Sequence, residues 1–261
     1  MLTLISAVIL AVLILKEKTK KLTLSGVKSS AAMMLISSAA VGIAVFDFIR
    51  SLLSILNSFF KVDDMFGNLG VLVFSSKVFS GINLAISSIL MIPLAIAAIY
   101  ILVTMVRRPL EREGAENDAV FESRCAERHA HMAMIAAEVT GVTFVASILA
   151  TIPFWSQFIA MVIILNPVTV LFLILVTFGL AFIPLIALAV LGNAPLIIIF
   201  SVATTALTAL YAFSAVFGIA ASVRAYRSHR AEKAEVVICG LLSLLPVWSI
   251  FPMIYLRKKC R

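Results

Sequence analysis

The chain has 261 residues, of which 62% are hydrophobic and only 13% are charged, and its mean hydropathy is +1.14. Soluble domains carry about 25% charged residues, so this composition excludes an ordinary soluble domain. The net charge of +8 does not indicate a nucleic-acid partner. Lys and Arg fall mostly in four clusters beside apolar runs, as in the loops that flank membrane spans.

The longest apolar block predicts several spans that pack together. From Met132 to Val223 the only acidic or basic side chain is Glu138. About 20 apolar residues cross the hydrocarbon core as one helix, whereas barrel strands alternate polar and apolar residues. We therefore expect an all-α, polytopic integral membrane bundle, a single membrane domain over 1–261 with about seven transmembrane helices. The alternatives are eight helices or a re-entrant C-terminal hairpin.

The first expected span covers 2–15 and is followed by a lysine cluster: Lys16, Lys18, Lys20 and Lys21. A secretory signal peptide has its basic residues before the apolar core and a small-residue cleavage site after it. Because neither feature occurs here, we interpret the segment as an uncleaved anchor. The basic cluster then predicts an N-terminus outside the cell and the lysines in the cytoplasm.

The stretch 29–60 predicts one long helix, whose part 29–49 is the second span. A polar stripe follows one face of its second half: Asp47, Arg50, Ser51, Ser54, Asn57, Ser58 and Lys61. In one interpretation Asp47 and Arg50 line a water-filled path. In the other, the span ends near Ile49 and an amphipathic helix continues along the interface, with Asp47 and Arg50 as an ion pair near the lipid headgroups.

The next segments predict a third span and a cytoplasmic loop. The stretch 68–79 is apolar but short, and we interpret it as a half-helix before the span 82–106, which Pro93 kinks. Two arginines from Arg107 onward end that span and mark the loop 107–130 as cytoplasmic. From Ala119 the pattern becomes helical again and leads into the fourth span.

Three residues in this loop are weak candidates for metal ligands. Glu122, Cys125 and His129 follow one another at i, i+3 and i+7 and so share a helical face. Their side-chain types bind transition metals. One helix rarely supplies a closed site, however, and the chain has no second His or Cys cluster. We therefore expect no metal and no cofactor, and interpret the segment as a solvated helix extension.

Glu138 is the strongest single candidate for a functional residue. It lies six residues inside the fourth span, 132–152, which corresponds to about 9 Å of helical rise. A carboxylate at that depth is costly and is by default a functional hypothesis. His131, one heptad earlier on the same face, suggests a proton relay from the cytoplasmic side. The structural alternative is a glutamate shallow enough to reach the headgroups.

A break in the apolar block adds Asn166 to the candidate site. Asn is a good N-cap and proline is favoured at the first helical position, so Asn166-Pro167 predicts a span over 167–191. The remaining piece, 153–165, is short for a full crossing. Several transporter folds build substrate sites from such discontinuous helices. The alternative is one long, proline-kinked helix over 155–191.

The last two expected spans cover 195–223 and 236–256. The first carries a small residue at every fourth position, which favours close helix contact: Ser214, Gly218 and Ser222. With three crossings between Met132 and Val223 the C-terminus is cytoplasmic, and four crossings reverse this, but each choice leaves four Lys or Arg on the wrong side. A re-entrant hairpin broken at Pro246 instead places both flanking basic clusters inside, after four crossings.

Absent motifs narrow the function. The chain has no GxxxxGK[ST], GxSxG or HExxH pattern, so we expect no enzyme activity of those types. The leading hypothesis is a transporter or permease, or the membrane subunit of a transport complex with an ATPase or membrane-protein partner. The alternative is a non-catalytic scaffold or assembly protein in the cell membrane. An intramembrane enzyme that uses His129, His131 or Glu138 is the least favoured hypothesis.

Overall fold

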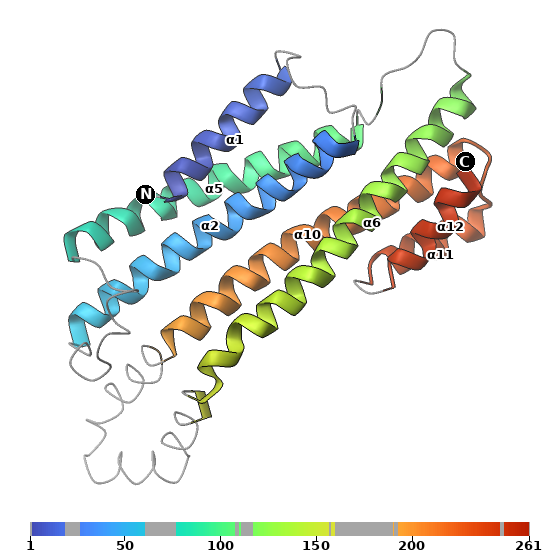
Figure 1. Cartoon of the computed structure of the whole chain (residues 1–261). Coiled ribbons are helices and arrows are strands. Elements are labelled where there is room, and N and C mark those ends of the chain that lie inside the picture. The colour runs from blue at the N-terminus through green and yellow to red at the C-terminus, as the bar shows by residue number, and fades with distance from the viewer. Residues whose placement is uncertain are drawn as a thin grey trace. The chain divides into compact units, whose positions relative to one another are not determined.

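The computed structural model describes residues 2–18, 27–60, 77–107, 110, 117–156, 158–159, 190, 193–245 and 248–260. In these ranges all regular secondary structure is helical, in seven α-helices and one 3-10 helix (Figure 1). The all-α prediction is therefore confirmed for this part of the chain. Asn166, the expected half-helix 68–79 up to residue 76, and the expected span 167–191 apart from residue 190 lie outside the described residues.

Helices cover the stretches 2–15, 29–49, 82–106 and 195–223 and nearly all of 132–152, and that each of these stretches crosses a membrane stays a prediction. The helices are α1 (Leu2–Lys18), α2 (Val27–Phe60), α5 (Lys77–Arg107), α6 (Asp118–Thr151), η1 (Ile152–Phe154), α10 (Ala194–Arg227), α11 (Lys233–Ser243) and α12 (Ile250–Cys260). Among the described residues, four stretches are long and apolar enough to cross a membrane: Ser29–Leu56, Ser80–Arg107, Asp118–Phe154 and Ala194–Arg227. The one around Glu138 is 37 residues long, about 55 Å of helix, so it exceeds a hydrocarbon core of about 30 Å.

The chain packs into two compact units. Unit 1 comprises Met1–Ile5, Gly42–Met91 and Val145–Thr204, and unit 2 comprises Ser6–Val41, Ile92–Phe144 and Thr205–Arg261. The boundaries fall inside helices, so the long helices contribute to both units. A single membrane domain over 1–261 stays a prediction.

Unit 1 has an apolar core between α2 and α10. Leu53 of α2 and Ala194 and Ile198 of α10 are buried, and partly buried apolar side chains pack against them: Phe46, Ile49, Leu56, Val190 and Val202. The α2 members of this core, Phe46, Ile49, Leu53 and Leu56, recur at three- and four-residue steps and so share one face of the helix. The polar stripe lies on another face of the same helix.

In unit 2 the small residues of α10 bring neighbouring helices close. Ser214 Oγ donates to the Ala133 carbonyl of α6 at 3.2 Å. A Cβ atom added to Gly218 would lie 2.6 Å from Ser243 Oγ of α11. The predicted contact face of Ser214 and Gly218 is therefore confirmed, and it is used by two different helices. Backbones approach this closely only where side chains are small.

The C-terminal segment departs from its leading prediction. A continuous span over 236–256 is wrong, because α11 ends at Ser243, α12 begins at Ile250, and the two helices contact each other (Figure 1). The reason is in the sequence: proline lacks an N–H group and disfavours helical backbone in the residue before it, here Leu245. Each helix has 11 residues, about 16 Å, too short to cross a bilayer. The alternative hairpin broken at Pro246 agrees with the observed break.

Substitution of Gly218 by Ala should destabilise the contact between α10 and α11. The new methyl group meets both Cβ and Oγ of Ser243, at 2.7 and 2.6 Å, so one of the helices must shift. We expect a loss of roughly 1–3 kcal/mol in unfolding free energy, measured by thermal unfolding in detergent. Gly240→Ala in α11 is the matched control, since nothing lies within 4 Å of the added atom. Equal effects of the two substitutions would contradict the close approach.

Candidate functional site

A buried carboxylate lies in unit 1 where α1, α2 and α5 meet. Asp47 of α2 is 2% exposed, and its Oδ2 accepts hydrogen bonds from the Thr3 backbone N–H at 3.2 Å and from Thr3 Oγ1 at 3.0 Å. Thr3 Oγ1 lies 3.0 Å from Ser87 Oγ of α5. A hydroxyl has one proton, and Thr3 gives its proton to Asp47, so Ser87 donates to Thr3. Three helices are thus joined through one carboxylate.

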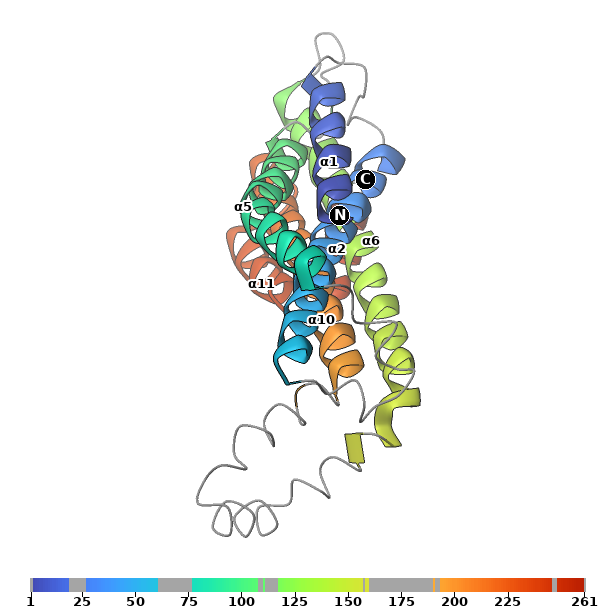
Figure 2. The ribbon, with the colours of Figure 1, turned by 90° about the vertical axis from the view of Figure 1, so that its left-hand side faces the viewer.

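The rest of the seam consists of small polar side chains. Ser54 of α2 and Ser80 of α5 share a hydrogen bond of 2.7 Å. Ser51 and Asn83 are also buried in unit 1. We call the set Thr3, Asp47, Ser51, Ser54, Ser80, Asn83 and Ser87 the polar seam. Figure 2, viewed together with Figure 1, shows α1 running beside α2 and α5, the helices that carry it.

The polar seam shows what surrounds the polar stripe that was predicted on α2. Asp47, Ser51 and Ser54 are buried against other helices, so they do not lie along a lipid interface. Arg50 is only partly buried and makes no ion pair with any described residue. The expected Asp47–Arg50 ion pair is therefore wrong, because Thr3 supplies donors that the Asp47 carboxylate requires.

Glu138 lies elsewhere, on the exposed face of α6 in unit 2. Large apolar side chains on the same helix are exposed beyond it, among them Val142 at 70% and Leu149 at 59%. His131, one heptad earlier, is partly buried. The described structure therefore places Glu138 on a surface rather than in a bundle interior, and it assigns Asp47 and Glu138 to different units.

The weak metal candidates have other contacts. Glu122 forms an ion pair of 3.0 Å with Arg224. Cys125 is fully buried, and the buried His129 ring stacks on Phe217 with 5.8 Å between centroids. Within the described ranges, no group of three or more His, Cys, Asp or Glu side chains is arranged to hold a metal ion. The shared helical face thus serves packing and ion pairing.

Ion pairs and hydrogen bonds join the helix ends of unit 2. Arg224, near the end of α10, donates to Glu122 of α6 and, at 3.2 Å, to the Val106 carbonyl at the end of α5. Arg128 of α6 donates to Ser30 of α2 at 2.8 Å. These pairings were not predicted from the sequence. The available signal was the presence of acidic residues in a predicted helix flanked by basic clusters.

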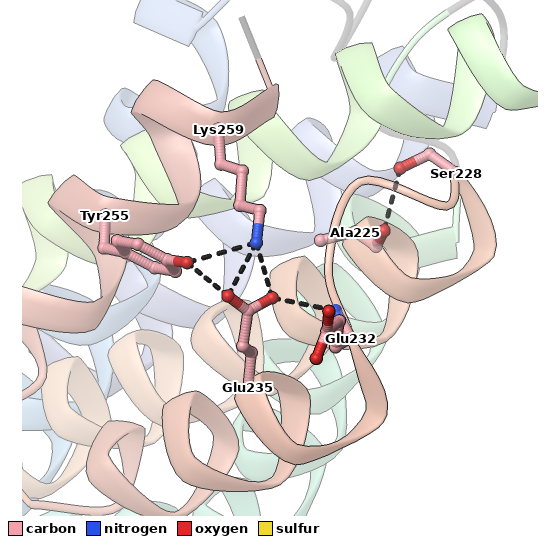
Figure 3. A network of polar contacts seen from close by, with 6 residues as sticks. All are labelled: Ala225, Ser228, Glu232, Glu235, Tyr255 and Lys259. Atoms are coloured by element: carbon pink, nitrogen blue, oxygen red, sulfur yellow. Dashed lines mark hydrogen bonds and ion pairs between the residues drawn. The ribbon is translucent and has the colours of Figure 1, made fainter.

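A second network fixes the hairpin of α11 and α12 (Figure 3). Lys259 Nζ lies 2.6 Å from both carboxylate oxygens of Glu235 and 3.1 Å from the Tyr255 hydroxyl, which also donates to Glu235. The Glu232 backbone N–H donates to Glu235 at 2.8 Å. These donors, Lys259 foremost, lower the pKa of Glu235 to about 2. The same hydrogen bond raises the pKa of Lys259 to about 12.

No protein-family model matches this chain, and neither a curated protein nor a solved structure matches it. The candidate site is therefore defined by its own residues.

The pKa shifts predict a pH window for the hairpin. Glu235 stabilises the folded form above its ordinary pKa of 4.5, and this contribution disappears as the pH falls toward 2. Lys259 stabilises it below its ordinary pKa of 10.5, and this contribution disappears as the pH rises toward 12. Fluorescence of Trp248, in a Trp155→Phe background, should report an intact hairpin between these limits. Glu235→Gln should abolish the acidic limb, and a limb that persists in this variant would contradict the assignment.

Removal of the Thr3 hydroxyl should weaken the polar seam. Thr3→Val keeps the side-chain shape but leaves Asp47 with one donor fewer, so we expect a loss of about 0.5–2 kcal/mol in unfolding free energy. Thr140→Val is the matched control, because that hydroxyl donates within its own helix, to the Ala136 carbonyl. Thermal unfolding of the detergent-solubilised variants measures both. A larger effect at Thr140 than at Thr3 would argue against an interhelical role.

Proposed function

We propose that the chain is a multi-pass protein of the cell membrane that acts as a transporter or as the membrane subunit of a transport complex. The observation that carries this proposal is Asp47, a buried carboxylate within the stretch Ser29–Leu56 of membrane-spanning length. Ionisable groups inside spans are costly and commonly mark ion or proton pathways. The hydroxyls of Thr3 and Ser87 continue from this carboxylate, and carboxylate and hydroxyl oxygens are groups that can accept a proton or a small cation.

The distribution of basic residues supports an orientation with the N-terminus outside and the C-terminus in the cytoplasm. Within the described helices, basic residues in a last helical turn all belong to unit 2: Lys16, Lys18, Arg107, Arg224, Arg227, Arg257, Lys258 and Lys259. Contacts such as Arg224–Glu122 and Lys259–Glu235 bring several helix ends together. By the positive-inside rule, this end of unit 2 faces the cytoplasm.

The hairpin of α11 and α12 also removes the conflict between the two counts of crossings, each of which left four Lys or Arg on the wrong side of the membrane. α6 leaves the basic end of unit 2 and α10 returns to it, so the chain between them crosses the membrane an even number of times. With α1, α2, α5, α6 and α10 as five spans, two crossings between α6 and α10 give about seven spans. The hairpin of α11 and α12 then stays on the cytoplasmic side, and all the basic clusters lie inside.

A scaffold or assembly protein is the second candidate, and Glu138 favours it. A carboxylate exposed among large apolar side chains of a span costs about 2.5–3.5 kcal/mol in lipid. A polar group from another membrane protein would offset this cost. The same observation suits the subunit form of the first proposal, in which Glu138 contributes to assembly and Asp47 to transport.

Asp47→Asn and Glu138→Gln separate these roles. The transport proposal predicts that Asp47→Asn, which keeps the side-chain shape and one acceptor oxygen, no longer supports the growth that depends on the gene. The amount of folded protein should be unchanged. Glu138→Gln should instead reduce copurification of an ATPase or membrane-protein partner in mild detergent. Asp118→Asn, at the exposed start of α6, is the control for loss of one negative charge. If expression, folding, growth and copurification were unchanged in both variants, the transport proposal would lose its support.

A further inference from the structure

Unit 2 contains a cavity between α6 and α12 with a volume of about 200 Å³. Met134 of α6 and Ile254, Arg257 and Lys258 of α12 line it. The lining therefore combines two cationic side chains with two apolar ones. The cations belong to the last turn of α12, and Ile254 lies one turn earlier.

Arg257, which lines the cavity, carries one hydrogen-bond donor that has no acceptor among the described residues. Arg257 Nε is buried and makes no hydrogen bond with any described residue, and its distance to Glu127 Oε1 is 3.9 Å, too long for one. Lys258 is exposed and forms no ion pair within the described ranges. Buried donors without an acceptor are rare and costly. A guanidinium fork fits the oxygens of a phosphate or carboxylate especially well.

Three charged or titratable groups of α6 lie near the lining cations. Glu127 faces Arg257, His131 lies within electrostatic reach of Arg257, and Glu138 is one turn beyond Met134. Of these three groups, Glu127 alone approaches a lining cation closely enough to count as an ion pair. Glu127 and Glu138 formally balance Arg257 and Lys258, but only Glu127 lies within ion-pair distance of a lining cation, so Lys258 keeps a charge without an acidic partner in the described ranges.

We propose that this cavity binds an anionic phospholipid, with the phosphate on Arg257 and Lys258 and the start of an acyl chain over Met134 and Ile254. Basic pockets between helices on the cytoplasmic side of membrane proteins bind such headgroups. A free phosphate ion uses the cations but gains nothing from the two apolar residues, so the lining favours a lipid. The inference rests on the membrane location in the proposed function but not on transport.

Native mass spectrometry of the full chain in detergent tests the site with dioleoyl phosphatidylglycerol and dioleoyl phosphatidylcholine as probes. The wild type should retain one phosphatidylglycerol about tenfold more tightly than phosphatidylcholine. Arg257→Gln combined with Lys258→Gln should weaken phosphatidylglycerol binding by about tenfold or more. Arg227→Gln combined with Lys233→Gln removes the same charge from exposed positions outside the cavity and should change the affinity less than about twofold.

A second variant keeps every charge. Met134→Trp fills the cavity and leaves Arg257 and Lys258 as the native residues, and it should also abolish the preference for phosphatidylglycerol. The Met134→Trp variant keeps the test valid if loss of the Arg257–Glu127 pair impairs folding of the charge variants. Circular dichroism and gel filtration report whether each variant is folded. Inorganic phosphate at the same concentration as the lipid should leave the bound phosphatidylglycerol in place.

Three results would overturn the lipid site. These are equal binding of the two lipids, equal losses in the cavity and control variants, and unchanged binding in folded Met134→Trp. Displacement of the lipid by inorganic phosphate would reassign the cavity to a free anion and so overturn the lipid. A separate experiment tests the membrane location in the proposed function. If alkaline carbonate released the wild-type protein from cell membranes without detergent, the proposed function would fail.

Discussion

The hydrogen bonds from Thr3 to Asp47 are the interaction on which the arrangement of α1, α2 and α5 depends. A carboxylate within a span loses its hydration, and without donors from the protein its charged form would be too costly to keep there. Thr3 supplies two donors, and Ser87 completes the connection to a third helix. The same requirement explains why the face of α2 that carries Asp47 continues with serines: small hydroxyls can pair across helices that pack closely.

At the basic end of unit 2 the helices are joined differently. Their ends meet through Arg224, Arg128 and Lys259, whose partners are carboxylates, a hydroxyl and a main-chain carbonyl. Basic side chains near helix C-termini are favourable because they compensate the dipole and the unpaired carbonyls. The proposed orientation follows from these joined helix ends. The polar seam and the joined helix ends therefore rely on different donors, neutral hydroxyls in one and cations in the other.

The sequence predicted the helical class and most helix bounds, because apolar runs and flanking basic residues act locally along the chain. It also predicted that Asp47 and Ser54 share a face and that Gly218 is a contact residue. It could not predict that Thr3, 44 residues from Asp47 in the chain, is its donor. Pairing across helices depends on their rotation and register, which periodicity alone does not determine. The final hairpin was only an alternative, because an apolar segment with one central proline suits both a kinked span and two short helices.

Accessibility of single cysteines tests most directly whether the basic helix ends lie together on the cytoplasmic side. Arg227→Cys, Lys258→Cys and Trp155→Cys, each at an exposed position and in a background without native cysteines, would be treated with a membrane-impermeant maleimide. The proposed orientation predicts labelling at 155 in intact cells, and labelling at 227 and 258 only after permeabilisation. Labelling of either 227 or 258 in intact cells would contradict it.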